Sequence, residues 1–450
     1  MCTSPTPAGF RAWIALALGV LMLGALLLRL QAVWQRIPAS PDELALHLVG
    51  DESGYEDLAY ALLQGVFFQS PVRVPVYPMF IAGVYYTLAE RSPAKLLYVQ
   101  AFVGVLAVPL TYLLARRLTG IIPALVAAGI VAFDGSLVDY APYMYAEILY
   151  TPLLLVALLA LFWALQAPRL WRFAGAGASM ALVTLCRPTS ALLPLLLPLL
   201  LPWGWRLRQK AGVCMAYGLT MVAIIAPWTY HNWRTFHRFL PLTISAGALW
   251  HGSPEFYHLT QGQRAFLDIW GHELNSQRNG GYDPHTIDGD RYFTERAVRS
   301  IRAEPGVYVT YSLKKAVYLW LGNPVVEWPY GALYNWSVMR QWYPYSSQKL
   351  LNMFVSRQLP IVALAALGFL AARRRIWTLV PLVAVCAYFT LVHMISWAEM
   401  RYSEPLHPLL AIILVTAGRE GFDVFKSRKG NCISSDLGPA DDSAKRTLEA

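Results

Sequence analysis

The sequence predicts an all-α membrane protein that crosses the bilayer about ten times. Of its 450 residues, 56% are hydrophobic and only 14% are charged, whereas about a quarter of the residues in an average soluble domain are charged. Apolar runs of roughly 15 to 23 residues recur along the chain, and a bilayer-crossing helix needs about 20. These observations exclude a soluble single domain, a disordered chain and a coiled coil.

Ten apolar runs are long enough to be interpreted as spans. The first resembles the apolar core of a signal peptide, but it continues to about Trp34 without a small-residue cleavage pattern, so we predict an uncleaved span. In chain order, the predicted spans lie near residues 12–34, 96–115, 120–134, 147–167, 170–186, 189–203, 211–228, 356–372, 376–396 and 403–418.

The formal net charge of +10 comes from cations clustered in short connections between the runs. Such clusters mark cytoplasmic loops by the positive-inside rule, so we expect no nucleic-acid partner. We expect a multi-pass protein of the plasma (inner) membrane with both termini cytoplasmic. The four cytoplasmic connections hold Arg116 with Arg117, Arg169 with Arg172, Arg206 with Arg208 and Lys210, and Arg373 to Arg375.

Four parts follow from this topology. Residues 1–228 form a transmembrane half whose outer loop, 36–95, holds two short helices at the membrane surface, Tyr55–Leu63 and Tyr77–Ala89. Residues 229–355 form a small, mostly helical extracytoplasmic domain. Residues 356–418 supply the C-terminal transmembrane helices, and residues 419–450 form a disordered cytoplasmic tail.

The extracytoplasmic domain contains an amphipathic helix over Asp290–Ala303. Asp288 or Asp290 is suited to cap it, and we prefer this interpretation to a two-carboxylate metal motif at Asp288-Gly289-Asp290. The following apolar stretch, Val307–Trp320, carries Lys314 and Lys315 in mid-run. Charges there favour a helix lying at the membrane interface over a span.

Isolated ionisable residues gather at the outer ends of the spans, which is typical of a site facing the outer interface and not of a transporter with midplane charges. Sugar transfer from a lipid phosphate at such a site needs a carboxylate as general base, and Asp51 or Glu52 is suited to it. The leaving phosphate needs guanidinium groups. Arg73, Arg187 and Arg401 are the candidates.

Structural interpretations of the same residues stay open. Asp51 and Glu52 are also suited to be solvated loop acids that cap the helix from Tyr55. Glu147 opens a span, where the helix dipole favours a carboxylate whatever its function. Arg187 with Pro188 is consistent with the turn of a helical hairpin, and His231 with an ordinary ring at the interface.

Several motifs resemble those of the GT-C glycosyltransferases that use polyprenyl-phosphate sugars, above all the branch of the protein O-mannosyltransferases and the lipid A aminoarabinose transferase. No single motif is specific, but their order and spacing are. One position departs from the pattern, because His231 stands where relatives usually have Arg. The motifs are Asp51-Glu52-Ser53-Gly54-Tyr55, Arg73-Val74-Pro75-Val76-Tyr77-Pro78, Gln100, Tyr145-Ala146-Glu147, Arg187-Pro188, Ala226-Pro227-Trp228 with Asn232, Gly247 to Gly252, and Arg401-Tyr402 with Pro405 and Pro408.

The resemblance implies a GT-C-like fold and an inverting transfer of one sugar from a polyprenyl-phosphate donor to an acceptor hydroxyl of a lipid, cell-envelope glycan or protein at the outer face. It implies no obligate metal or other cofactor, although Asp51, Glu52 and Glu147 are suited to hold a divalent ion. By analogy, Asp51, Glu52 and Glu147 are catalytic. Arg73, Arg187, Arg401 and His231 bind the donor phosphate, and Tyr55, Tyr77, Tyr145 and Asn232 position substrate.

Two other function classes are weighed against this one. A lipid-linked sugar flippase or other transporter predicts ionisable residues deep in the spans and internal repeats, and the sequence displays neither pattern. The second alternative is a membrane scaffold that descends from the same family but is catalytically silent. It would differ from the glycosyltransferase only in that it does not turn over the donor.

Overall fold

The computed structural model describes residues 8–38, 40–48, 50–261, 282–322, 347–372 and 375–436, and within these ranges the regular secondary structure is entirely helical. Five helical stretches are long and apolar enough to cross a membrane, namely Gly9–Arg36, Pro93–Leu118, Glu147–Ala164, Leu207–Phe236 and Trp377–Ile395. Shorter apolar helices accompany them. The predicted all-α membrane fold is confirmed.

The first half of the chain builds most of the bundle. Its elements are α1 (Ala8–Arg36), η1 (Pro41–His47), α2 (Asp51–Leu63), α3 (Val76–Leu88), α4 (Pro93–Val105), α5 (Ala107–Leu118), α6 (Ile121–Ala132), α7 (Gly135–Asp139), α8 (Glu147–Ala164), α9 (Leu170–Cys186), η2 (Pro188–Ser190), η3 (Leu193–Leu196), α10 (Leu197–Leu200) and α11 (Leu207–Phe236).

The second half adds the helices of the predicted extracytoplasmic domain and returns to the bundle. Its elements are α12 (Ala248–His251), α13 (Pro254–Gln261), α16 (Ile287–Ala303), α17 (Pro305–Leu321), α19 (Ser347–Ala372), η4 (Arg375–Leu379), α20 (Val380–Ile395), η5 (Met400–Leu406) and α21 (His407–Asp436). Of the predicted domain 229–355, residues 262–281 and 323–346 lie outside the described ranges.

Small side chains allow the bundle helices to approach closely. Helix α9 packs between α8 and α11, and a Cβ atom on Gly177 would overlap the carbonyl oxygen of Tyr217 in α11. Helix α6 likewise buries a row of alanines against its neighbours. Close backbone approach at small residues is the usual way in which membrane helices associate.

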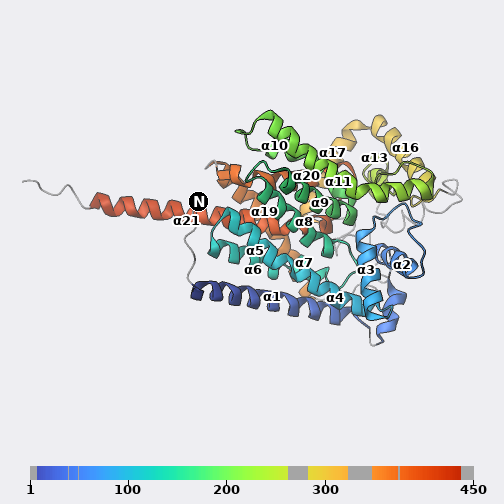
Figure 1. Ribbon diagram of the computed structural model, residues 1–450, viewed down its shortest axis with the longest axis horizontal. Helices are drawn as coiled ribbons and strands as arrows, with labels where there is room; N and C mark the ends of the chain where they lie inside the picture. Colours follow the sequence, from blue (N-terminus) through green and yellow to red (C-terminus); the bar gives the residue numbers. More distant parts are fainter. Residues whose placement is uncertain are drawn as a thin grey trace, which may run out of the picture.

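Figure 1 shows where the site end of the bundle lies. Helices α2 and α3 stand together at one end, with α13 and α16 near the same end, while α21 projects from the opposite end. The site described below is built at the end that holds α2 and α3, because Asp51 is the first residue of α2 and Arg73 lies in the loop before α3.

Four sequence expectations need correction. The expected span 189–203 is broken into η2, η3 and α10, because prolines at 188, 194 and 198 interrupt helical hydrogen bonding. The expected boundary at residue 228 falls inside α11, which continues to Phe236. The tail is not disordered from residue 419, because α21 continues to Asp436.

The amphipathic helix predicted over Asp290–Ala303 begins earlier than expected and has a different cap. Helix α16 begins at Ile287, and its cap is the Thr286 side chain, which accepts a hydrogen bond from the Gly289 N–H group. Asp290 instead accepts hydrogen bonds from the Ser245 hydroxyl and the Gly247 N–H group. Asp290 therefore fastens α16 to the segment before α12.

Candidate functional site

Asp51 and Glu52 lie in the first turn of α2, directly after Gly50. Gly50 has a φ of 60°, a conformation that glycine adopts without steric cost, and it serves as the N-cap without a side-chain hydrogen bond. Neither acid caps the helix. The helix dipole favours both carboxylates at this position, but their side chains turn to different partners.

Asp51 is held between two arginines from distant parts of the chain. Its Oδ1 atom accepts a hydrogen bond from Arg73 Nη2 at 2.5 Å, and its Oδ2 atom lies 2.8 Å from Arg401 Nη1. Arg401 Nε in turn lies 2.8 Å from Glu399 Oε2. The Asp51 side chain is 29% exposed, so this cluster remains open to solvent on one side.

Another ion pair lies beside Asp51 and its two arginines. It joins Glu147 at the start of α8 to Arg187 after α9. Tyr402 joins the two pairs, because the Arg187 guanidinium lies 4.5 Å and that of Arg401 lies 5.0 Å from its ring centre. The structure therefore brings together five predicted residues: Asp51, Arg73, Glu147, Arg187 and Arg401. We call this group the ion-pair cluster.

The arginines set the protonation state of Asp51. Burial alone would raise the pKa of this carboxyl group, but Arg401 and Arg73 outweigh it and hold the pKa well below its usual range. Burial raises the pKa of nearby Tyr55 to about 12. Asp51 is therefore a carboxylate at neutral pH, and Tyr55 keeps its proton.

Glu52 has a different environment from Asp51. Its side chain is fully buried, and each of its carboxylate oxygens accepts a hydrogen bond from Arg36 at 2.7 Å. Oε1 also accepts one from the Met144 N–H group at 2.9 Å. Arg36 further donates to the carbonyl of Pro142, so this pair ties α1 and α2 to the loop before α8.

The three predicted positioning tyrosines line the cluster or support it. The Tyr55 ring lies under the Arg73 guanidinium at 4.6 Å and meets the Tyr77 ring edge-on at 4.8 Å. Tyr77 is buried and donates its hydroxyl to Gln100 Oε1 at 3.1 Å. The Tyr145 ring lies 4.8 Å from the Arg401 guanidinium.

His231 and Asn232 are bound to other partners. His231 Nε2 lies 2.9 Å from the Phe68 carbonyl oxygen, and its ring meets that of Phe67 edge-on. Asn232 Nδ2 donates to the carbonyl groups of Leu240 and Leu242. These contacts fasten the end of α11 to neighbouring loops and connect neither residue to the ion-pair cluster.

Sequence reasoning missed several residues that complete this end of the bundle. Arg36 is a cation at the end of the first span that we expected to face outward, and this exception to the positive-inside rule could have been detected in the sequence. Arg29, seven positions earlier in α1, is 2% exposed and was passed over within an apolar run. Glu404 follows Arg401 in η5, but nothing in the sequence separates it from a loop acid.

The described residues contain no group of three or more histidine, cysteine, aspartate or glutamate side chains arranged to hold a metal ion. Both Asp51 oxygens face arginines, and both Glu52 oxygens face Arg36. The hydrogen-bond donors around the cluster are thus mainly guanidinium groups. Guanidinium forks are complementary to phosphate oxygens in shape and charge.

Part of the chain matches a known family model. Residues 71–231 match the family model described as dolichyl-phosphate-mannose-protein mannosyltransferase. This stretch contains Arg73, Tyr77, Glu147 and Arg187 of the site. No curated protein has a significant sequence match.

Solved structures share the fold at low sequence identity. The oligosaccharyltransferase AglB from Archaeoglobus fulgidus, in complex with an inhibitory peptide and a dolichol-phosphate, superposes with a TM-score of 0.53 and 14% identity over 97% of this chain and 53% of AglB. Its apo form gives a TM-score of 0.54 and 15% identity over 93% of this chain and 52% of AglB. The chain thus spans about half the length of AglB.

ArnT from Cupriavidus metallidurans, bound to undecaprenyl phosphate, matches 92% of this chain and 79% of its own length with 16% identity and a TM-score of 0.41. Together, the family match and the AglB superpositions confirm the resemblance to GT-C glycosyltransferases that the motifs predicted.

Proposed function

We propose that this chain, which has the GT-C fold, is a glycosyltransferase that moves a sugar from a polyprenyl-phosphate donor to an acceptor hydroxyl. The single observation that carries the proposal is the ion-pair cluster. In this cluster, Asp51 forms ion pairs with Arg73 and Arg401, and Arg187 lies beside them. A carboxylate suited to take a proton and arginines suited to bind a phosphate meet at one place.

The donor phosphate competes with Asp51 for the arginines. A lipid phosphate that enters the cluster provides oxygens that accept from the same guanidinium groups. Each arginine that turns to the phosphate stabilises the Asp51 carboxylate less, so the pKa of Asp51 rises and the carboxylate becomes a stronger base. Donor binding would thus activate Asp51 when the phosphate is in place.

The transfer is then a single displacement. The acceptor hydroxyl oxygen forms a bond to the anomeric carbon, the bond between that carbon and the phosphate oxygen breaks, and its electron pair stays on the phosphate. The hydroxyl proton moves to Asp51. Attack from the face opposite the phosphate inverts the anomeric centre, and polyprenyl phosphate is the second product.

Other residues orient these groups. Glu147 holds Arg187 by an ion pair, and the Tyr402 ring contacts the guanidinium groups of both Arg187 and Arg401. Glu52 is saturated by Arg36 and the Met144 N–H group, so we assign it a positioning role for the start of α2. We assign no metal to the reaction, since arginines provide the charge that the phosphate needs.

The proposal includes the setting of the reaction. The site lies at the end of the bundle opposite the projecting α21 (Figure 1), and the cationic connections of the sequence belong to the cytoplasmic side by the positive-inside rule. We therefore place the reaction at the outer face of the plasma (inner) membrane, with both termini cytoplasmic. Its partners are the donor lipid and a glycan, lipid or protein acceptor.

The decisive experiment uses the purified full chain in lipid nanodiscs, with a panel of radiolabelled undecaprenyl-phosphate sugars and membrane extract as acceptor source. We expect the wild type to consume one donor and release undecaprenyl phosphate. Asp51→Asn should lower turnover at least about 100-fold while retaining undecaprenyl phosphate binding. Asp423→Asn, an exposed aspartate of α21, is the matched control and should be unchanged.

Two results would overturn the proposal. Wild-type protein that consumes no donor would point to the silent scaffold, and movement of labelled lipid across a vesicle membrane without sugar transfer would point to the flippase. Full turnover of Asp51→Asn would refute Asp51 as the base. Mass spectrometry of lipid that copurifies with the wild type would identify the donor.

A further inference from the structure

Two of the arginines proposed to bind the phosphate share one aromatic ring. The guanidinium carbon of Arg187 lies 4.5 Å and that of Arg401 lies 5.0 Å from the centre of the Tyr402 ring. Arg401 Nη2 also donates to the Tyr402 hydroxyl at 3.2 Å. The face of an aromatic ring attracts cations, so the position of this ring influences where both arginines lie.

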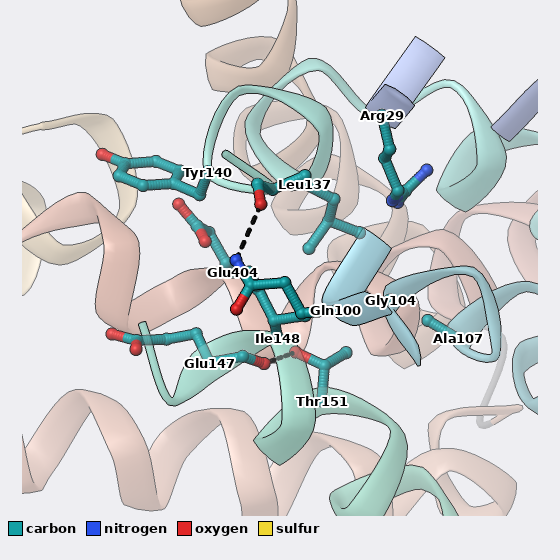
Figure 2. A pocket seen from close by; sticks show the side chains of 11 residues that line it. Arg29, Gln100, Gly104, Ala107, Leu137, Tyr140, Glu147, Ile148, Thr151 and Glu404 are labelled. Carbon is teal, nitrogen blue, oxygen red and sulfur yellow. Dashed lines mark hydrogen bonds between the residues drawn. The ribbon is translucent and has the colours of Figure 1, made fainter. Parts of the chain in front are cut away.

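Carboxylates provide other contacts of the same arginines. Arg187 pairs with Glu147, and Figure 2 shows the Glu147 side chain extending away from Thr151, whose hydroxyl donates to the main-chain carbonyl of Glu147. Arg401 faces two carboxylates at 2.8 Å each. A phosphate that enters competes with these carboxylates for the N–H groups. It does not compete for the Tyr402 ring, because the negative face of a ring attracts cations and repels anions.

His393 holds the Tyr402 ring from α20. The two rings are stacked, with their centres 4.8 Å apart and an angle of 21° between their planes. His393 lies in the last turn of α20 and is 3% exposed. Its Nδ1 atom lies 2.9 Å from the carbonyl oxygen of Trp397. A ring that is buried, stacked and hydrogen-bonded in this way gives Tyr402 a fixed surface to lie against.

The hydrogen bond to Trp397 identifies the form of the His393 ring that fits here. A carbonyl oxygen only accepts, so Nδ1 carries the proton, and Nε2 of the neutral ring has a lone pair. Nε2 is buried and has no hydrogen-bond partner among the residues that the structure describes. A proton on Nε2 would make a buried cation without an acceptor, against a ring that already contacts two arginines. The surroundings therefore suit a neutral imidazole that packs as an aromatic ring.

Trp397 connects the same contacts to Arg401 along the chain. Its side chain is 7% exposed and meets an aromatic ring of α13 edge-on, with the ring centres 5.5 Å apart. Its indole N–H group donates to Glu399 Oε1 at 2.6 Å, and Glu399 is a partner of Arg401. The segment that carries Arg401 is thus anchored before the arginine by Trp397 and after it by the ring that His393 holds.

We propose that His393 is a positioning residue, which holds the Tyr402 ring and thereby sets the spacing of Arg187 and Arg401 for one donor phosphate. This inference rests on the proposed function. His393 acts through Tyr402 and not on the reacting atoms. The stacked ring is the essential part of its side chain, and the hydrogen bond to Trp397 sets the orientation of that ring.

Three variants separate the ring from the hydrogen bond. His393→Phe keeps a ring that stacks on Tyr402 and loses the N–H group. His393→Asn keeps a donor near the place of Nδ1 and loses the ring, and His393→Met fills a similar volume with neither. Misplaced binding groups slow a reaction strongly, so we expect kcat for the accepted undecaprenyl-phosphate sugar to fall about 10- to 100-fold in the Asn and Met variants. His393→Phe should retain most of the turnover.

Undecaprenyl phosphate binding provides a measurement that a merely structural role would not change. Titration calorimetry compares the wild type, His393→Met, Tyr402→Leu and the double variant. If His393 acts through Tyr402, the loss of affinity caused by His393→Met should disappear in the Tyr402→Leu background. His258→Asn, which replaces an exposed histidine of α13, is the matched control and should bind and turn over like the wild type.

The outcomes separate this inference from the proposed function. Wild-type turnover with equal activity in all three His393 variants, or with an equal loss in all three, would overturn the positioning role alone. The same would follow from an unchanged effect of His393→Met on undecaprenyl phosphate affinity when Tyr402 is leucine. Absence of wild-type turnover on every donor would overturn both proposals.

Discussion

Asp51 and Arg401 come from opposite ends of the sequence, and their Oδ2 and Nη1 atoms lie 2.8 Å apart. The first residue of α2 is thus joined to the segment that precedes α21. Because Arg401 also faces Glu399, its guanidinium has two carboxylate partners before any phosphate arrives. This shared arginine couples the start of α2 to the C-terminal helices.

Substitution of Arg401 tests this coupling. Arg401→Gln removes a charge that would stabilise the leaving phosphate, and we expect kcat to fall about 100- to 1000-fold. Arg401→Lys keeps the charge but loses the planar fork, so its kcat should lie between those of the wild type and Arg401→Gln. Steady-state donor turnover measures both. Equal activity of the three proteins would exclude a role of Arg401 in transfer.

Glu52 and Arg36 form the pair that is expected to matter for stability. Removing one partner of a buried ion pair typically costs about 3 to 5 kcal/mol, and the Glu52 side chain is fully buried while that of Asp51 is 29% exposed. Glu52→Gln should therefore lower the melting temperature more than Asp51→Asn does. Thermal unfolding of the two purified variants, followed by intrinsic fluorescence, measures the difference. A smaller loss for Glu52→Gln would assign it a role other than anchoring.

The sequence anticipated the helical class and most of the ion-pair cluster for a physical reason. Charged residues at the ends of apolar runs are costly and conspicuous, so Asp51, Arg73, Glu147, Arg187 and Arg401 were all found by their position. Their pairing was not predictable, because it depends on which helix ends meet. For the same reason, the sequence did not reveal that Asp51 and Glu52 have different partners, since Glu52 meets Arg36 only in the folded bundle.

Other features were obscured by local patterns. The run over residues 189–203 has the composition of a span, yet its prolines divide it into short helical pieces. Beyond Arg419 the composition suggested disorder, but the side chains retain helical spacing, with Arg419 beside Asp423 and Lys426 over Phe422. His231 stood at a motif position, although its ring is bound to the Phe68 carbonyl.

Two glycines of α9 offer a test of the bundle packing. A Cβ atom on Gly177 would overlap the backbone of Tyr217, whereas one on Gly175 has nothing within 4 Å. Gly177→Val should therefore force α9 and α11 apart, with a loss of at least about 1 to 3 kcal/mol, and Gly175→Val should be tolerated. The yield of monodisperse protein and its melting temperature measure the effect. Equal melting temperatures would show that α9 and α11 do not approach closely at Gly177.

Lys315 makes the stability of the fold around α17 depend on pH. Its side chain is fully buried in α17 and donates to the Gly252 carbonyl at 3.0 Å and the Ile395 carbonyl at 3.4 Å, and burial lowers its pKa from 10.5 to about 7. Between these values the unfolded chain binds a proton that the folded chain lacks, so stability rises with pH, by at most about 1.4 kcal/mol per pH unit.

Lys315→Met keeps the length of the side chain and removes this titration. We therefore expect the melting temperature of the wild type to rise relative to that of Lys315→Met as the pH is raised from 7 to about 9.5. Below pH 7 Lys315 is protonated in both the folded and the unfolded wild type. The difference in melting temperature between the wild type and Lys315→Met should therefore become constant there. Lys314→Met is the control, because Lys314 is exposed and donates to the Tyr257 hydroxyl. Parallel melting curves for wild type and Lys315→Met across this range would mean that the buried amine does not change its charge there.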